Sequence, residues 1–183
     1  MITDLAAFSG MEGESMTRGH GWLFLDLGRR LERSLAITRL VRSALEASPS
    51  QVGILEPMLE VADSSMTYRR RYFAEPQLSP VLDLLLADGT NPRALRFQLD
   101  TMSVLLSHLP RHPRAPSPTS EERIVAHAIE ALAAADFDGL SEPGADVAFE
   151  RLTALLDLLD EDLRGVSDTV TFHYFSHAEQ RVN

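Results

Sequence analysis

The chain of 183 residues contains neither cysteine nor lysine. The lack of cysteine excludes disulfides, thiolate metal ligands and thiol catalysis, and we expect a reducing cytoplasm as its compartment. All 17 basic residues are arginines, whose planar fork suits carboxylates and phosphates better than an ammonium group does. A GC-rich genome would produce the same bias, so the arginines alone identify no ligand.

Long apolar runs are also absent. The longest, such as VLDLLLA, are interrupted by charge and fall far short of the roughly 20 residues that cross a bilayer. The N-terminal stretch MITDLAAFSGMEGES has early acidic residues and no basic segment, so we do not expect a secretion signal. These absences predict a protein that does not associate with membranes.

Positive charge is scarce in the second part of the chain. Residues 1–114 carry 13 arginines against 13 acidic residues, whereas residues 115–183 carry 4 against 14, so the whole net charge of −10 lies there. Nucleic-acid binding depends on neutralising phosphates with basic side chains. We therefore expect no nucleic-acid partner.

Leucine and alanine dominate, β-branched residues are sparse, and 44% of the residues are hydrophobic, which favours helices around one core. The repeat of Leu23, Leu27, Leu31 and Leu35 indicates a first amphipathic helix. Helices are expected over residues 21–46, 57–73, 80–87, 91–109, 119–135 and 143–175, the last bent near Gly165. No stretch alternates as a strand does. We predict an all-α, antiparallel bundle of six or seven helices, forming a single domain over 1–183 with an internal loop at 110–118.

The densest group of charges lies in GWLFLDLGRRLERSL, residues 21–35. Asp26 precedes Arg29 and Arg30 by three and four residues, and Arg29 precedes Glu32 and Arg33 by the same steps, so these side chains can meet on a helix surface. The leucine stripe lies beside them. Part of this charge should therefore border the core, where a charge must be paired.

A second group lies in SSMTYRRRYF, residues 64–73, where Tyr68, Arg71 and Tyr72 share a helix face. If the first two helices form an antiparallel hairpin, both groups lie at similar heights, about 24 and 22 Å from the turn at 1.5 Å per residue. The hairpin would bring them side by side. We then expect Glu32 to pair with Arg69 or Arg71.

Three interpretations of these groups remain open: a pocket that grips an anionic ligand, an ion-pair network that fixes helix register, and a solvated surface. No nucleophile and base can be assigned, so the catalytic residues are unknown, and no cofactor is expected. The candidate ligand-binding residues are Arg29, Arg30, Glu32, Arg33, Tyr68, Arg69, Arg71 and Tyr72.

Two histidines near the C-terminus have the spacing of a helical metal pair. His173 and His177 are four residues apart, but HExxH is absent and no acidic third ligand is evident. We predict that they pack with the neighbouring aromatic residues and that the chain has no metal site.

A family resemblance spans most of the chain, from about Phe8 to His177. It is carried by FSGMEGESMTRGHGWLFLDLGRRLERSL, by YRRRYFAEPQLSPVLDLLLADGTNPRALRFQL and by YFSH. Its most specific part is GRRLERS, supported by the preceding Trp-x-Phe and by NPRALRFQL. These stretches resemble the alpha-E domain, a bacterial helical family named for a Glu-Arg motif, and Glu32-Arg33 would be that pair. The family is typically longer and has a second such motif, so the chain resembles its C-terminal part.

The resemblance implies a non-enzymatic helical accessory domain that works with an ATP-grasp peptide or amide ligase. Transglutaminase-like proteins belong to the same setting, so the resemblance places the chain in peptide or amide-bond metabolism. Two alternatives remain. One is an enzyme or substrate-binding subunit with an Arg/Tyr cleft for a carboxylated or phosphorylated metabolite, and the other is a purely structural dimerising bundle.

A homodimer is expected from the missing N-terminal part. Phe8, Trp22, Phe24 and Leu25 lie where that part would attach, and an apolar face of this kind usually marks an interaction surface. A twofold dimer is the commonest way to cover such a face. We expect the first 30 residues to contribute heavily to the interface.

Overall fold

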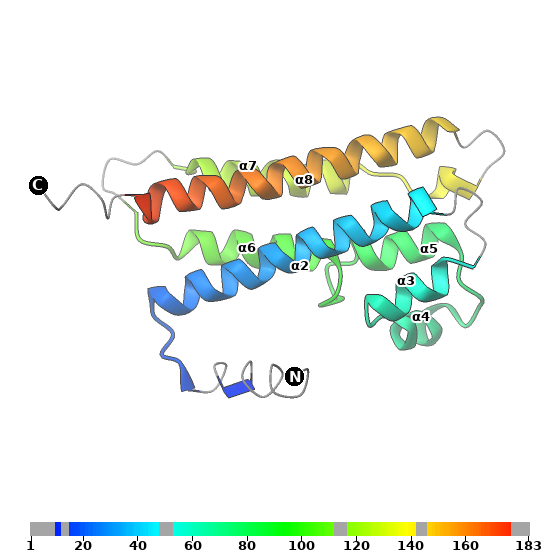
Figure 1. The fold of residues 1–183 in the computed structure, drawn as a ribbon, viewed down its shortest axis with the longest axis horizontal. Helices are drawn as coiled ribbons and strands as arrows, with labels where there is room; N and C mark the ends of the chain where they lie inside the picture. The colour runs from blue at the N-terminus through cyan, green and yellow to red at the C-terminus, as the bar shows by residue number, and fades with distance from the viewer. Residues whose placement is uncertain (1–9, 12–14, 48–52, 112–116, 142–145, 177–183) are drawn as a thin grey trace, which may run out of the picture.

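The computed structural model describes residues 10–11, 15–47, 53–111, 117–141 and 146–176. Its body is built from four helices: α2 (His20–Ala47), α6 (Leu95–Ser107), α7 (Ser120–Ala133) and α8 (Asp146–Tyr174). α2 packs on α6, α6 on α7, α7 on α8 and α8 on α2, which closes the bundle. Successive helices run in opposite directions (Figure 1). The arrangement is an antiparallel helical bundle.

Shorter elements lie between α2 and α6 and between α7 and α8. They are α3 (Leu55–Val61), α4 (Ser65–Tyr72), α5 (Leu78–Leu82), the π-helix η1 (Asp83–Ala87) and the 3₁₀ helix η2 (Asp138–Ser141). They gather at the end of the bundle where α2 ends and α8 begins (Figure 1). The described residues form seven α-helices and no strand, which confirms the predicted all-α bundle.

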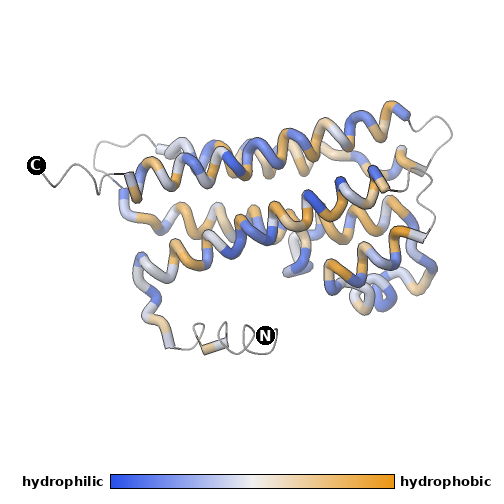
Figure 2. Tube along the Cα trace, viewed as in Figure 1, coloured by the Kyte–Doolittle hydropathy of each residue, from blue (hydrophilic) through white to orange (hydrophobic). Residues whose placement is uncertain are grey.

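The core lies along the bundle axis. Val41 of α2, Leu99 of α6, Leu132 of α7 and Leu159 of α8 are all buried within it. Hydrophobic and hydrophilic residues are interspersed along each long helix (Figure 2). An amphipathic helix, which places its hydrophobic residues on one face, has a mixture of this kind. Within the described ranges, none of the helices combines the length and the apolar character needed to cross a bilayer.

The start of α7 follows the sequence signals closely. Thr119 is the N-cap, its hydroxyl accepts from the Glu122 amide, and the Glu122 carboxylate accepts from the Thr119 amide at 2.8 Å. This capping box satisfies two amides that a helix leaves unpaired. α8 corresponds to the helix predicted over 143–175, of which residues 143–145 lie outside the described ranges, and it continues through Gly165 without interruption.

The predicted helix over 57–73 is wrong. Two helices, α3 and α4, replace it because Asp63 adopts a left-handed conformation with φ 51° and the Ser64 amide bonds back to the Leu59 carbonyl. The expected start of the fourth helix at Asn91 is also wrong. The Asn91 side chain accepts from the Arg93 amide in a turn, and α6 begins only at Leu95.

Candidate functional site

Four arginines gather where α2 packs against α6. Arg29, Arg30 and Arg33 come from α2, and Arg93 comes from the turn before α6. The charges of Arg29, Arg30 and Arg93 all act on Arg33, so each of these three guanidinium groups lies within electrostatic range of Arg33. We call these four residues the arginine cluster.

Arg30 is the best-held member of the arginine cluster. Its guanidinium forms an ion pair with Asp26 at 3.1 Å, donates to the Gln98 Oε1 atom at 3.3 Å and lies 5.9 Å from the centre of the Phe97 ring. Its Nε atom is buried and has no hydrogen-bond partner among the described residues. A buried donor without a partner is costly.

Gln98 connects the arginine cluster to the turn before α6. Its side chain is 0% exposed, its Oε1 atom accepts from Arg30, and its Nε2 atom donates to the Pro92 carbonyl at 2.6 Å. Asn91, also buried, donates from its side chain to the Leu84 carbonyl at 3.0 Å. The turn that carries Arg93 is therefore tied on one side to α2 and on the other to η1.

Arg33 is a cation in a cationic environment. Partial burial and the charges of Arg30, Arg93 and Arg29 lower its pKa below the ordinary value for arginine, while Asp26 opposes this. Arg93 forms an ion pair with Asp63. Within the described part of the chain, the Arg33 guanidinium makes no ion pair or hydrogen bond. A carboxylate or phosphate placed beside Arg33 would relieve this repulsion.

The expected pairing of Glu32 with Arg69 or Arg71 is wrong. Arg69 pairs with Glu56, and Arg71 pairs with Asp88 at 2.5 Å. Glu32 lies on the exposed surface of α2. The predicted hairpin requires one straight second helix. The break at Asp63 redirects α4 instead, so that its arginines meet acidic residues of α3 and of the η1 end.

The two tyrosines of α4 also have other partners. Tyr68 is buried, and its hydroxyl donates to the Glu75 carbonyl at 3.3 Å and accepts from the Gln77 amide at 3.1 Å. The Tyr72 hydroxyl donates to Asp83 at 3.2 Å. Burial, the charge of Asp83 and this hydrogen bond raise the pKa of Tyr72. The Tyr68 hydroxyl therefore fastens α4 to the segment that follows it, and the Tyr72 hydroxyl fastens α4 to η1.

Sequence reasoning missed Arg93 and Gln98. Gln98 did leave a signal, because it is a polar residue within the apolar stripe formed by Leu95, Leu99 and Met102 of α6. A buried polar side chain needs partners, and such a residue points to a hydrogen-bonded contact between helices. Arg93 left no comparable signal, since a single arginine in a turn is ordinary.

A second polar contact joins the start of α7 to the end of α8. Glu121 is 2% exposed and accepts from Tyr174 at 3.4 Å, and it pairs with the His173 Nδ1 atom at 3.1 Å. The His173 ring lies 5.6 Å from the Phe172 ring in a tilted arrangement and 6.4 Å from the Tyr174 ring in an edge-on arrangement, while His177 lies outside the described residues. Over the described ranges, no group of three or more potential ligands could hold a metal ion.

Comparison with known proteins places this sequence in a family. The model of the alpha-E family, described as a predicted alpha-helical domain with a conserved ER motif, matches residues 1–175. The chain has three Glu-Arg dipeptides, at 32–33, 122–123 and 150–151. The first of them lies in GRRLERS, the stretch that most specifically resembles the family.

Curated relatives come from mycobacteria. Uncharacterized proteins of Mycobacterium bovis and of two Mycobacterium tuberculosis strains are each 32% identical over 173 residues, which is 93% of this chain and 19% of the relative. The chain thus spans about a fifth of the length of the relatives it matches. No solved structure matches it.

Proposed function

As the chain belongs to the alpha-E family, we propose that it is a non-enzymatic helical accessory domain that works with an ATP-grasp peptide or amide ligase. Its resemblance to domains fused to, or encoded beside, such ligases supports the partner. The chain covers 19% of the relatives, which supports a role alongside further domains of a longer protein. We propose the cytoplasm as its site of action.

The observation that carries the proposal is the position of Arg33. It lies on the exposed side of α2 among three further arginines, with no counter-charge of its own among the described residues. Opposite charges across an interface steer association and penalise wrong partners. We propose that the arginine cluster meets carboxylates on the ligase surface and that Arg33 forms the central ion pair.

A charge reversal tests this contact. The chain is titrated with a circularly permuted ATP-grasp ligase, the class of partner that the resemblance implies, and the affinity is measured by calorimetry. Arg33→Glu should weaken the affinity at least tenfold, about 1.4 kcal/mol. Arg39→Glu is the matched control, because Arg39 is also exposed on α2 but lies outside the arginine cluster. Equal affinities for both variants, or no binding by the unaltered chain, would remove the proposal.

A metabolite-binding subunit is the second candidate. The buried Arg30 Nε atom without a partner favours it, because a bound carboxylate or phosphate would satisfy that donor. Tyr68 and Tyr72 would take no part, since their hydroxyls are occupied. Stabilisation of the isolated chain by inorganic phosphate or citrate, lost in Arg33→Gln, would favour this candidate over the accessory domain.

A further inference from the structure

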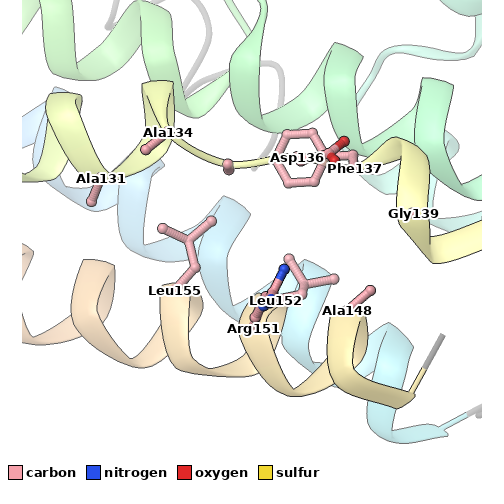
Figure 3. A pocket seen from close by; sticks show the side chains of 10 residues that line it. Ala131, Ala134, Asp136, Phe137, Gly139, Ala148, Arg151, Leu152 and Leu155 are labelled. Carbon is pink, nitrogen blue, oxygen red and sulfur yellow. The ribbon is translucent and has the colours of Figure 1, made fainter.

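A hollow of about 280 Å³ lies between the end of α7, η2 and the first turns of α8, apart from the arginine cluster. Leu152 and Leu155 rise into it from α8, opposite the loop that follows α7 (Figure 3). Ala131, Ala134 and Ala148 line its sides. These small side chains leave the space open.

Two opposite charges border the hollow. Arg151 extends from α8, and Asp136 lies on the facing loop (Figure 3). In the described part of the chain, Arg151 makes no ion pair, so the two charges do not neutralise each other at contact distance. The Asp136 Oδ1 atom accepts from the Asp138 amide at 2.9 Å, which holds its carboxylate in place. An exposed arginine and an exposed aspartate are therefore both among the residues that line this small hollow.

We propose that this hollow binds a free α-amino acid with a small side chain. Its carboxylate would pair with Arg151, its ammonium group with Asp136, and its side chain would contact Leu152 and Leu155. The volume supports a ligand of this size, because it falls below the roughly 300–1,000 Å³ of pockets that hold drug-sized molecules. The proposal concerns a different site from the arginine cluster and is independent of the proposed function.

The pair of charges selects for a ligand that carries both signs. Asp136 repels a ligand with only a carboxylate, and Arg151 repels a ligand with only an amine. Discrimination by repulsion of this kind is a common source of specificity. Alanine should therefore bind better than propionate or ethylamine, each of which lacks one of its two charges.

Nuclear magnetic resonance titrations of the full chain test the proposal. Alanine is expected to shift the amide signals of residues that line the hollow, with an affinity at least tenfold higher than that of propionate or ethylamine. Arg151→Gln and Asp136→Asn should each lower the alanine affinity at least tenfold. Asp136→Asn keeps an oxygen that can accept from the Asp138 amide, so it preserves the loop.

Arg164→Gln is the matched control, because Arg164 is an exposed arginine of α8 outside the hollow. It should bind alanine as the unaltered chain does. The spectrum without ligand shows whether each variant is folded. Three results would each overturn the proposal: no shifts with alanine, binding of propionate as tight as that of alanine, or equal loss in Arg164→Gln and Arg151→Gln.

Discussion

At the scale of single residues, the position of the arginine cluster depends on one buried side-chain amide, that of Gln98. Gln98 accepts from Arg30 of α2 and donates to the Pro92 carbonyl beside Arg93. The Oε1 and Nε2 atoms of Gln98 therefore connect Arg30 of α2 with the turn that carries Arg93. A buried polar group of this kind stabilises the structure only while every partner is present, because each group left unpaired loses its hydration without compensation.

Gln98→Leu should lower the free energy of unfolding by about 1–3 kcal/mol, since it leaves the Pro92 carbonyl unsatisfied and removes a partner of Arg30. Urea denaturation measures the change. Ser103→Ala on the exposed face of α6 is the control and should change the free energy by no more than about 0.5 kcal/mol. A loss of that small size in Gln98→Leu would contradict a structural role for the amide.

Glu32→Ala should lower the free energy of unfolding by less than about 1 kcal/mol, because Glu32 is exposed and its expected arginine partners pair elsewhere. Thermal or urea denaturation would detect a larger effect. A loss of about 3–5 kcal/mol would mean that Glu32 neutralises a buried arginine after all.

At the scale of elements, Glu121 links the start of α7 to the end of α8. Burial opposes its ionisation, but hydrogen bonds from its own amide, Thr119 and His173 outweigh this and lower its pKa below the ordinary 4.5. The positive end of the α7 dipole acts in the same direction. The charged carboxylate thus stabilises the packing of the two helices at this end of the bundle.

The contribution of Glu121 to stability should depend on pH. Because its pKa in the folded chain is lowered, the contribution is complete above pH 4.5 and is lost as the pH falls through the folded value. The difference in unfolding free energy between the unaltered chain and Glu121→Gln should therefore shrink between pH 6 and pH 3. Glu130→Gln, at an exposed position of α7, should show little such change. A constant difference for Glu121→Gln would contradict the lowered pKa.

At the scale of the whole molecule, apolar surface collects where α2 begins and α8 ends. Phe24 packs edge-on against Tyr174 and Phe175, with ring centres 5.2 Å apart in both pairs. Phe172 and Phe175 are 64% and 57% exposed. Phe8, which was expected to contribute, lies outside the described residues. A contiguous apolar patch of more than a few hundred Å² usually marks an interaction surface, and these exposed aromatic side chains would contribute to one.

We expect the chain to form a homodimer through this end. Light scattering at micromolar concentration should give twice the chain mass of 20.3 kDa. Trp22→Asp should restore the monomer mass, because a charge in an apolar interface loses its hydration. Val147→Asp, at an exposed position near the opposite end of the bundle, should leave the dimer intact. A clean mass of 20.3 kDa for the unaltered chain would contradict the prediction.

The sequence by itself determined the elements whose signals are local. Leucine periodicity predicted α2, and the Thr119 signal with its acidic first turn predicted α7. Both succeed because hydrophobic spacing and capping act within one or two helical turns. It also placed Arg29, Arg30 and Arg33 on one helix surface.

Only the tertiary structure decided which groups meet those arginines. Arg30 bonds to Gln98 across 68 positions of the chain, a contact that exists because α2 packs on α6. The left-handed Asp63 broke the expected second helix and turned α4 toward Glu56 and Asp88. The predicted spacing of side chains along α4 was correct. The direction of α4, however, depends on the backbone conformation of Asp63, which hydrophobic periodicity does not predict. Which side chains pair between two helices depends on the directions of those helices. These directions are determined only when the whole core packs.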